Sequence, residues 1–107
     1  MTIFNLKKGK LLVGTLTYDR GMWVFFYSPE FKMQDKIKPL TDFPLLDKIY
    51  NSKELYPFFI SRIPGKGQTS YQEAIKNGET DYVSLLKKFG RRTITNSYIL
   101  ENPNDLL

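Results

Sequence analysis

The sequence contains no cysteine and no histidine. Disulfide bridges and thiolate metal sites are therefore excluded, as are the commonest general base and the strongest thiol nucleophile. Catalysis by carboxylates alone needs two acids placed together, whereas the acidic residues here stand mostly beside turns or helix starts, where capping explains them. We expect no catalytic residues, no metal ion and no cofactor, and hence a protein that is not an enzyme.

Long apolar runs are absent as well. The first ten residues alternate between apolar and polar and lack the apolar stretch of a signal peptide. No run approaches the roughly 20 apolar residues that a membrane-spanning helix needs. We therefore expect no association with membranes and a cytoplasmic location, and the lack of cysteine fits a reducing compartment.

Positive charge is in modest excess, with 16 Lys and Arg against 11 Asp and Glu and a net charge of +5. The basic residues form short clusters and no long arm. A module that binds nucleic acid, with Tyr and Phe stacked on single-stranded bases, stays open as an alternative. A solvated surface with a positive bias explains the same pattern more simply, so we expect no specific nucleic-acid binding.

Aromatic residues make up 15% of the 107 residues. A chain of this length predicts one domain over residues 1–107, because domains commonly run to about 100–150 residues. So small a domain cannot hide all its rings, and we expect some of them to form a binding face. Trp23 and Tyr27 are the candidates, although a Trp in a strand is more usually half-buried core.

The first 27 residues predict a β-meander. Runs rich in strand-forming residues alternate with two short turns that contain Gly9 and Gly21. Ser28 and Pro29 have the composition of a helix start, which predicts a brief helical turn. The strands are expected at Thr2–Leu6, Leu11–Tyr18 and Met22–Tyr27, with further strands at Phe43–Tyr50 and Thr93–Leu100 and a frayed tail from Asn102.

Helices are predicted in the second half of the chain. Pro57 opens a short helix over Phe58–Ile63, and the spacing of Ser70 and Glu73 is that of a capping box for a helix over Tyr71–Lys76. Thr80 or Asp81 caps a third helix with one apolar face, and Gly90 closes this helix in the position where glycine commonly ends one. The apolar face consists of Tyr82, Leu85, Leu86 and Phe89.

Together these elements predict an α+β fold. A small antiparallel sheet, formed by the N-terminal meander and a C-terminal strand, packs against three short helices within residues 57–89.

The loop after the first of these helices is the most conspicuous in the chain. Its Gly65-Lys66-Gly67 run lacks the spacing of a phosphate-binding loop and follows a helix, where a phosphate-binding loop follows a strand. A mobile connector is one interpretation and a partner-binding loop is the other. The partner-binding candidates are Arg62, Pro64, Gly65, Lys66, Gly67 and Gln68, together with Trp23 and Tyr27.

Four segments, in order, resemble the N-terminal subdomain of HipA-type toxin kinases. Phe58–Pro64 is similar to that family's FF-x-NLLP helix and loop, and Tyr82–Arg91 is similar to its F-x-LL-x-x-IGR segment. The earlier two segments, Lys10–Leu16 and Trp23–Pro29, resemble its opening hairpin. The family usually continues after Gly-Arg with an Asp and a small-residue strand, and Arg92–Tyr98 replaces that pattern here.

The resemblance implies a role in a toxin–antitoxin system. None of the ATP-binding or catalytic kinase motifs occurs in these 107 residues, which favours the freestanding form found in HipS-type antitoxins of tripartite HipBST systems. Such a protein binds and inhibits a HipT-like serine/threonine kinase, alongside a DNA-binding HipB-like protein. Two alternatives stay open: a split HipA subdomain that completes a kinase without inhibiting it, and the nucleic-acid-binding module.

Overall fold

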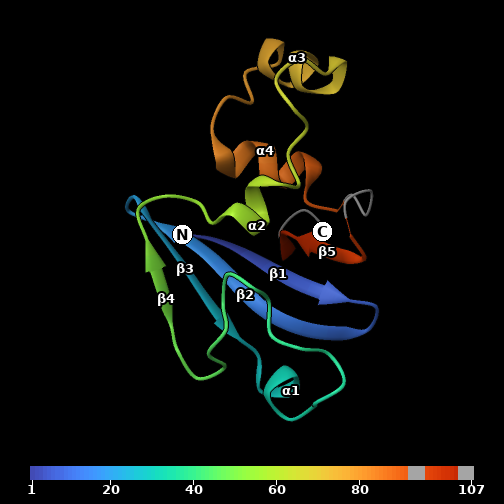
Figure 1. The fold of residues 1–107 in the computed structure, drawn as a ribbon. Helices are drawn as coiled ribbons and strands as arrows, with labels where there is room; N and C mark the ends of the chain where they lie inside the picture. The colour runs from blue at the N-terminus through green and yellow to red at the C-terminus, as the bar shows by residue number, and fades with distance from the viewer. Residues whose placement is uncertain (92–95, 104–107) are drawn as a thin grey trace.

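The computed structural model describes residues 1–91 and 96–103 (Figure 1). Within them lies one antiparallel sheet whose strands stand in the order β4-β3-β2-β1-β5. The predicted α+β class is confirmed. The elements are β1 Thr2–Lys8, β2 Leu11–Asp19, β3 Met22–Tyr27, α1 Pro29–Lys32, β4 Tyr50–Ser52, α2 Pro57–Ile60, α3 Thr69–Lys76, α4 Tyr82–Phe89 and β5 Tyr98–Glu101.

Strands β1 to β3 form the predicted meander. Two tight turns join them, and Gly9 (φ 60°) and Gly21 (φ 79°) take the positive φ angles that these turns need. Ser28 then caps α1, because its hydroxyl accepts a hydrogen bond from the Phe31 amide at 3.0 Å. The composition of the first 31 residues is thus sufficient to predict their local structure.

The strand predicted over Phe43–Tyr50 is wrong. That segment is a loop, and the strand in this region, β4, spans only Tyr50–Ser52 at the edge of the sheet. Leu45 and Ile49, which suggested a strand, are 60% and 61% exposed. Phe43 is buried instead by stacking on Phe25, with ring centroids 4.2 Å apart.

The core lies on one face of the sheet and is rich in aromatic rings. Trp23 and Tyr27 belong to it, with only 3% and 2% of their surface exposed, so the expectation that they form an exposed binding face is wrong. The Tyr27 hydroxyl donates to the Phe43 carbonyl at 2.7 Å and accepts from the Leu40 amide at 2.8 Å. It thereby holds the long loop against the sheet.

The helices of the second half stand at one end of the sheet, with α3 farthest from it and α1 at the opposite end (Figure 1). Of the two predicted caps for α4, Thr80 and Asp81, it is Asp81 that caps the helix, accepting from the Ser84 amide at 2.8 Å. The capping box at Ser70 is wrong, because α3 begins two residues earlier, at Thr69, and Gln68 is its N-cap without a side-chain bond. In the described residues no helix is long and apolar enough to cross a membrane.

Gly90 ends α4 as predicted. Its φ is −61°, an ordinary helical value, so the backbone conformation alone does not require glycine here. A Cβ at this position would stand 2.6 Å from the Leu86 oxygen and 2.8 Å from the Leu100 oxygen. Glycine is therefore needed because the helix end and β5 approach so closely, and the Leu100 amide donates to the Gly90 carbonyl at 2.9 Å.

The predicted frayed tail begins at Asn102, but the structure shows this residue buried. Asn102 is only 6% exposed, and its side-chain amide donates to the Ile3 carbonyl at 3.0 Å, so Asn102 itself is not part of a frayed tail. Residues 92–95, which include the start of the predicted last strand, and residues 104–107 lie outside the described part of the chain.

Candidate functional site

The loop between α2 and α3 is exposed at its tip. Gly65, Lys66, Gly67 and Gln68 are all exposed, whereas Pro64 at the base of the loop is buried. The tip is a closed turn, because the Gln68 amide donates to the Gly65 carbonyl at 3.0 Å. An exposed turn of defined shape is suited to contact with a partner.

The backbone at the two loop glycines is unstrained. A Cβ at Gly65 or Gly67 would meet nothing within 4 Å, and neither residue has a positive φ angle. Folding therefore does not require glycine at these two positions, in contrast to Gly90. Alanine substitutions here can separate a binding role from a structural one.

Arg62 does not belong to the exposed surface of this loop. It is only 3% exposed, so the expectation that its charge meets a partner is wrong. Its Nε donates to the Gly90 carbonyl at 2.9 Å and its Nη1 to Asn96 Oδ1 at 2.8 Å, while Nη2 donates to the Tyr98 carbonyl. The guanidinium thus joins the end of α2 to the end of α4 and to β5, and its burial lowers its pKa.

No local pattern in the sequence predicts this role for Arg62. Its acceptors are 28 to 36 residues away along the chain, and two of them are backbone carbonyls, which carry no side-chain signature. The fork of N–H donors on arginine is suited to such a junction, because it can reach several carbonyls at once. We call this arrangement the Arg62 junction.

The two candidates from the sheet, Trp23 and Tyr27, do not lie at the loop tip. Tyr27 is enclosed in the core beside Phe31, with ring centroids 4.8 Å apart. Trp23, although buried, lines a surface pocket near the start of α4. The structure therefore brings neither residue together with the loop tip. In the described part of the chain, no group of three or more acidic side chains is placed to hold a metal ion.

Comparison with known protein families shows which family the chain belongs to. A family model described as the HipA N-terminal domain matches residues 5–95. The chain belongs to the HipA N-terminal domain family. A search of curated proteins found no match.

Family membership agrees with the structural role of Gly14, which follows Val13 in the hairpin segment that resembles HipA. A Cβ on Gly14 would stand 2.6 Å from the Phe26 carbonyl oxygen and 2.7 Å from Phe25 Cζ. Only glycine lets β2 pair with β3 while the Phe25 ring lies over it. The Val-Gly pair of the HipA-like hairpin is therefore explained here by packing in the core.

Proposed function

We propose that this chain is an antitoxin-like protein of the HipS type, which binds a HipT- or HipA-type serine/threonine kinase toxin and inhibits it. The observation that carries the proposal is the match to the HipA N-terminal domain over residues 5–95. That match covers no kinase domain, and the sequence contains no histidine or cysteine for other common chemistry. A HipB-like DNA-binding protein is the further partner that we propose for the same complex.

The loop tip is the surface that we propose for kinase contact. Lys66 is exposed and forms no ion pair with any described residue, and the glycines beside it leave its surroundings open. Kinases hold magnesium ions with acidic side chains in the active-site cleft. An ammonium group on an exposed turn between two glycines fits that chemistry, because the neighbouring residues carry no side chains that would clash with those acids.

The experiment compares variants in a kinase assay. The triple variant Gly65→Ala, Lys66→Ala, Gly67→Ala is titrated against a HipT-like kinase, and autophosphorylation is measured. We expect about tenfold more of the variant than of the wild type to be needed for half-inhibition, which corresponds to about 1.4 kcal/mol of binding energy. The double variant Lys36→Ala, Lys38→Ala is the matched control, since it removes exposed charge from a loop elsewhere.

The outcomes separate the alternatives. If the triple variant inhibits as well as the wild type, the loop is a connector and the contact lies on another surface. If the wild type forms a stable complex and leaves the kinase fully active, the chain is a structural complement of a split HipA kinase. That result contradicts the inhibitory function.

A further inference from the structure

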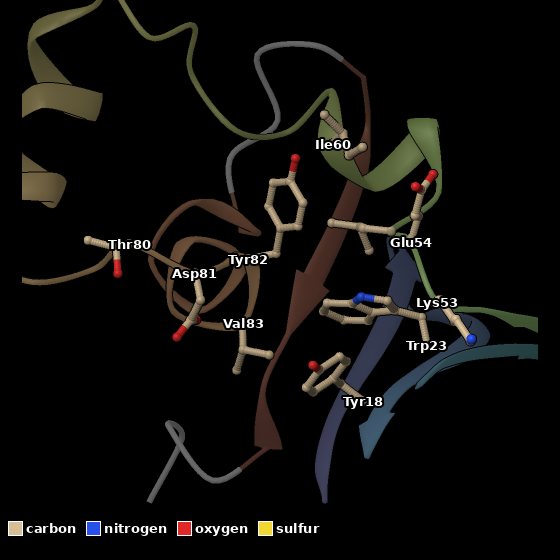
Figure 2. A pocket seen from close by; sticks show the side chains of 10 residues that line it. Tyr18, Trp23, Lys53, Glu54, Ile60, Thr80, Asp81, Tyr82 and Val83 are labelled. Carbon is tan, nitrogen blue, oxygen red and sulfur yellow. The ribbon is translucent and has the colours of Figure 1, made fainter. Parts of the chain in front are cut away.

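A pocket of about 600 Å³ lies between the sheet and the first turn of α4 (Figure 2). Its walls come from segments far apart in the sequence: the turn end of β2 and β3, the segment before α2, α2 itself, and the start of α4. The pocket is large enough for a few amino-acid residues. The lining residues include Tyr18, Trp23, Lys53, Glu54, Ile60 and Tyr82.

Two aromatic rings, tilted at 48° to each other, line the pocket. The centroids of Tyr18 and Trp23 are 4.5 Å apart, and Trp23 is 97% buried, being 3% exposed. The indole N–H of Trp23 makes no hydrogen bond within the described part of the chain. Figure 2 shows the indole nitrogen on the edge of the ring turned away from Tyr18. Trp23 Nε1 is not among the buried side-chain atoms that lack a hydrogen bond in the described residues, so this N–H reaches solvent, where it is available to a ligand in the pocket.

The apolar stripe of α4 continues into the pocket. Leu85, Leu86 and Phe89 of that stripe are buried in the protein, whereas Tyr82, one turn earlier, is 44% exposed. Ile60 on α2 is 38% exposed and lines the same pocket. Two large apolar side chains from different helices thus stand unpacked at one opening, which favours contact with an apolar group of a partner.

Carboxylates at the opening favour a positive charge. Glu54 and Asp81 are exposed, and neither forms an ion pair with a described residue. Lys53 also lines the pocket, but Figure 2 shows its amino group on the far side of Trp23 from Tyr82 and Asp81. The side of the pocket away from the Lys53 amino group therefore carries negative side chains in Figure 2, although the protein as a whole carries +5.

We propose that this pocket binds a short peptide segment of a partner protein in which a large apolar side chain stands next to Lys or Arg. The apolar side chain packs against Tyr18, Ile60 and Tyr82, a main-chain carbonyl of the peptide accepts from the indole N–H, and the basic group approaches Glu54. The site shares no residue with the loop Pro64–Gln68. It is therefore independent of the proposed kinase inhibition.

The test uses the single tryptophan of the chain as its reporter. Three capped dipeptides, acetyl-Leu-Arg-amide, acetyl-Leu-Gln-amide and acetyl-Gly-Arg-amide, are titrated while Trp23 fluorescence is recorded. We expect the Leu-Arg peptide to bind with a Kd between about 0.01 and 1 mM, as ligands of this size do. Loss of the arginine is expected to weaken binding about fivefold and loss of the leucine side chain tenfold or more, in line with about 0.2–1 kcal/mol for an exposed ion pair and more for a buried leucine. Equal binding of all three, or none up to about 10 mM, overturns the proposal.

Variants assign the binding to this pocket. Glu54→Gln removes the charge that the basic group of the peptide approaches. It is expected to weaken the Leu-Arg peptide and to leave the Leu-Gln peptide unchanged, whereas Glu73→Gln, which removes an exposed charge outside the pocket, alters neither. Tyr82→Ala is expected to weaken both leucine peptides, with Leu45→Ala as the exposed apolar control.

The indole N–H has its own test. Trp23→Phe keeps a buried ring and removes the donor, and its binding is measured by isothermal titration because the fluorescent reporter is lost. We expect about fivefold weaker binding of the Leu-Arg peptide, as for one hydrogen bond of about 1 kcal/mol. If this variant and Glu54→Gln both bind the peptide as the wild type does, the proposed site is wrong.

Discussion

Replacing Arg62 with lysine tests the Arg62 junction most directly. The substitution keeps the positive charge and most of the side-chain length, and it removes the fork of donors. Arg62 makes three hydrogen bonds to described residues on different segments of the chain, to Gly90, Asn96 and Tyr98. A single ammonium group at 3% exposure cannot meet acceptors on all of these segments.

The expected destabilisation follows from those bonds. If lysine keeps one of the three, two buried bonds from a charged donor are lost, at about 1.5–3 kcal/mol each. The free energy of unfolding is then lower by about 3–6 kcal/mol, against a total of about 5–15 kcal/mol for a domain. For a domain of this size the melting temperature falls by about 12–24 °C.

Urea denaturation followed by Trp23 fluorescence measures the effect, since Trp23 is the single tryptophan and is buried in the core. Lys66→Ala serves as the control: it removes a positive charge from the exposed loop tip, and we expect a change within about 0.5 kcal/mol. A loss below about 1 kcal/mol for Arg62→Lys would refute the reasoning, because it would mean that the guanidinium bonds contribute little beyond the charge.

Two further predictions concern pH and nucleic acid. Burial raises the pKa of Tyr27 from 10.0 to about 12, so its contribution is complete below pH 10 and is lost as the pH rises from 10 to 12, by up to about 2.7 kcal/mol. Urea midpoints at pH 9 and above pH 11 measure this loss, and Tyr27→Phe is expected to reduce it; an equal loss in both proteins contradicts the assignment to Tyr27. DNA binding, measured by fluorescence anisotropy at physiological salt, is expected to be weaker than about 10⁻⁶ M and indifferent to sequence, because only charge drives it. Tight, sequence-selective binding by the isolated chain favours the nucleic-acid alternative instead.

The local elements were predictable where a single residue determines the backbone. Gly9 and Gly21 occupy turns that need positive φ, Ser28 and Asp81 cap helices, and these positions alone delimit the meander and two helices. The strand predicted at Phe43 is wrong because its apolar residues lie in different environments, one buried and two exposed. Phe43 packs on Phe25, whereas Leu45 and Ile49 face solvent, and alternation along the chain cannot distinguish these cases.

The candidate site was predictable only in part, for a related reason. The exposed loop tip follows from Pro64, Gly65 and Gly67, which are local signals. The burial of Arg62 depends on carbonyls at the end of α4 and in β5. These acceptors are far from Arg62 along the chain, so the residues next to Arg62 do not indicate its burial. Trp23 and Tyr27 were expected on a binding face because aromatic content alone does not say which rings the helices and the long loop cover.

The Arg62 junction and the loop tip together lead to the last prediction. Arg62 stands two residues before Pro64, so its bonds fix the chain where the loop begins, and the Gln72 side chain donates to the Lys66 carbonyl from α3. A loop held on both sides loses little conformational entropy when it binds, so its rigidity adds to affinity. We therefore expect Arg62→Lys, assayed at a temperature where it stays folded, to inhibit the kinase more weakly although the loop tip is unchanged. The triple alanine variant is expected to lose inhibition without losing stability. If folded Arg62→Lys inhibits as well as the wild type, rigidity of the loop base has no part in inhibition, and the junction serves the fold alone.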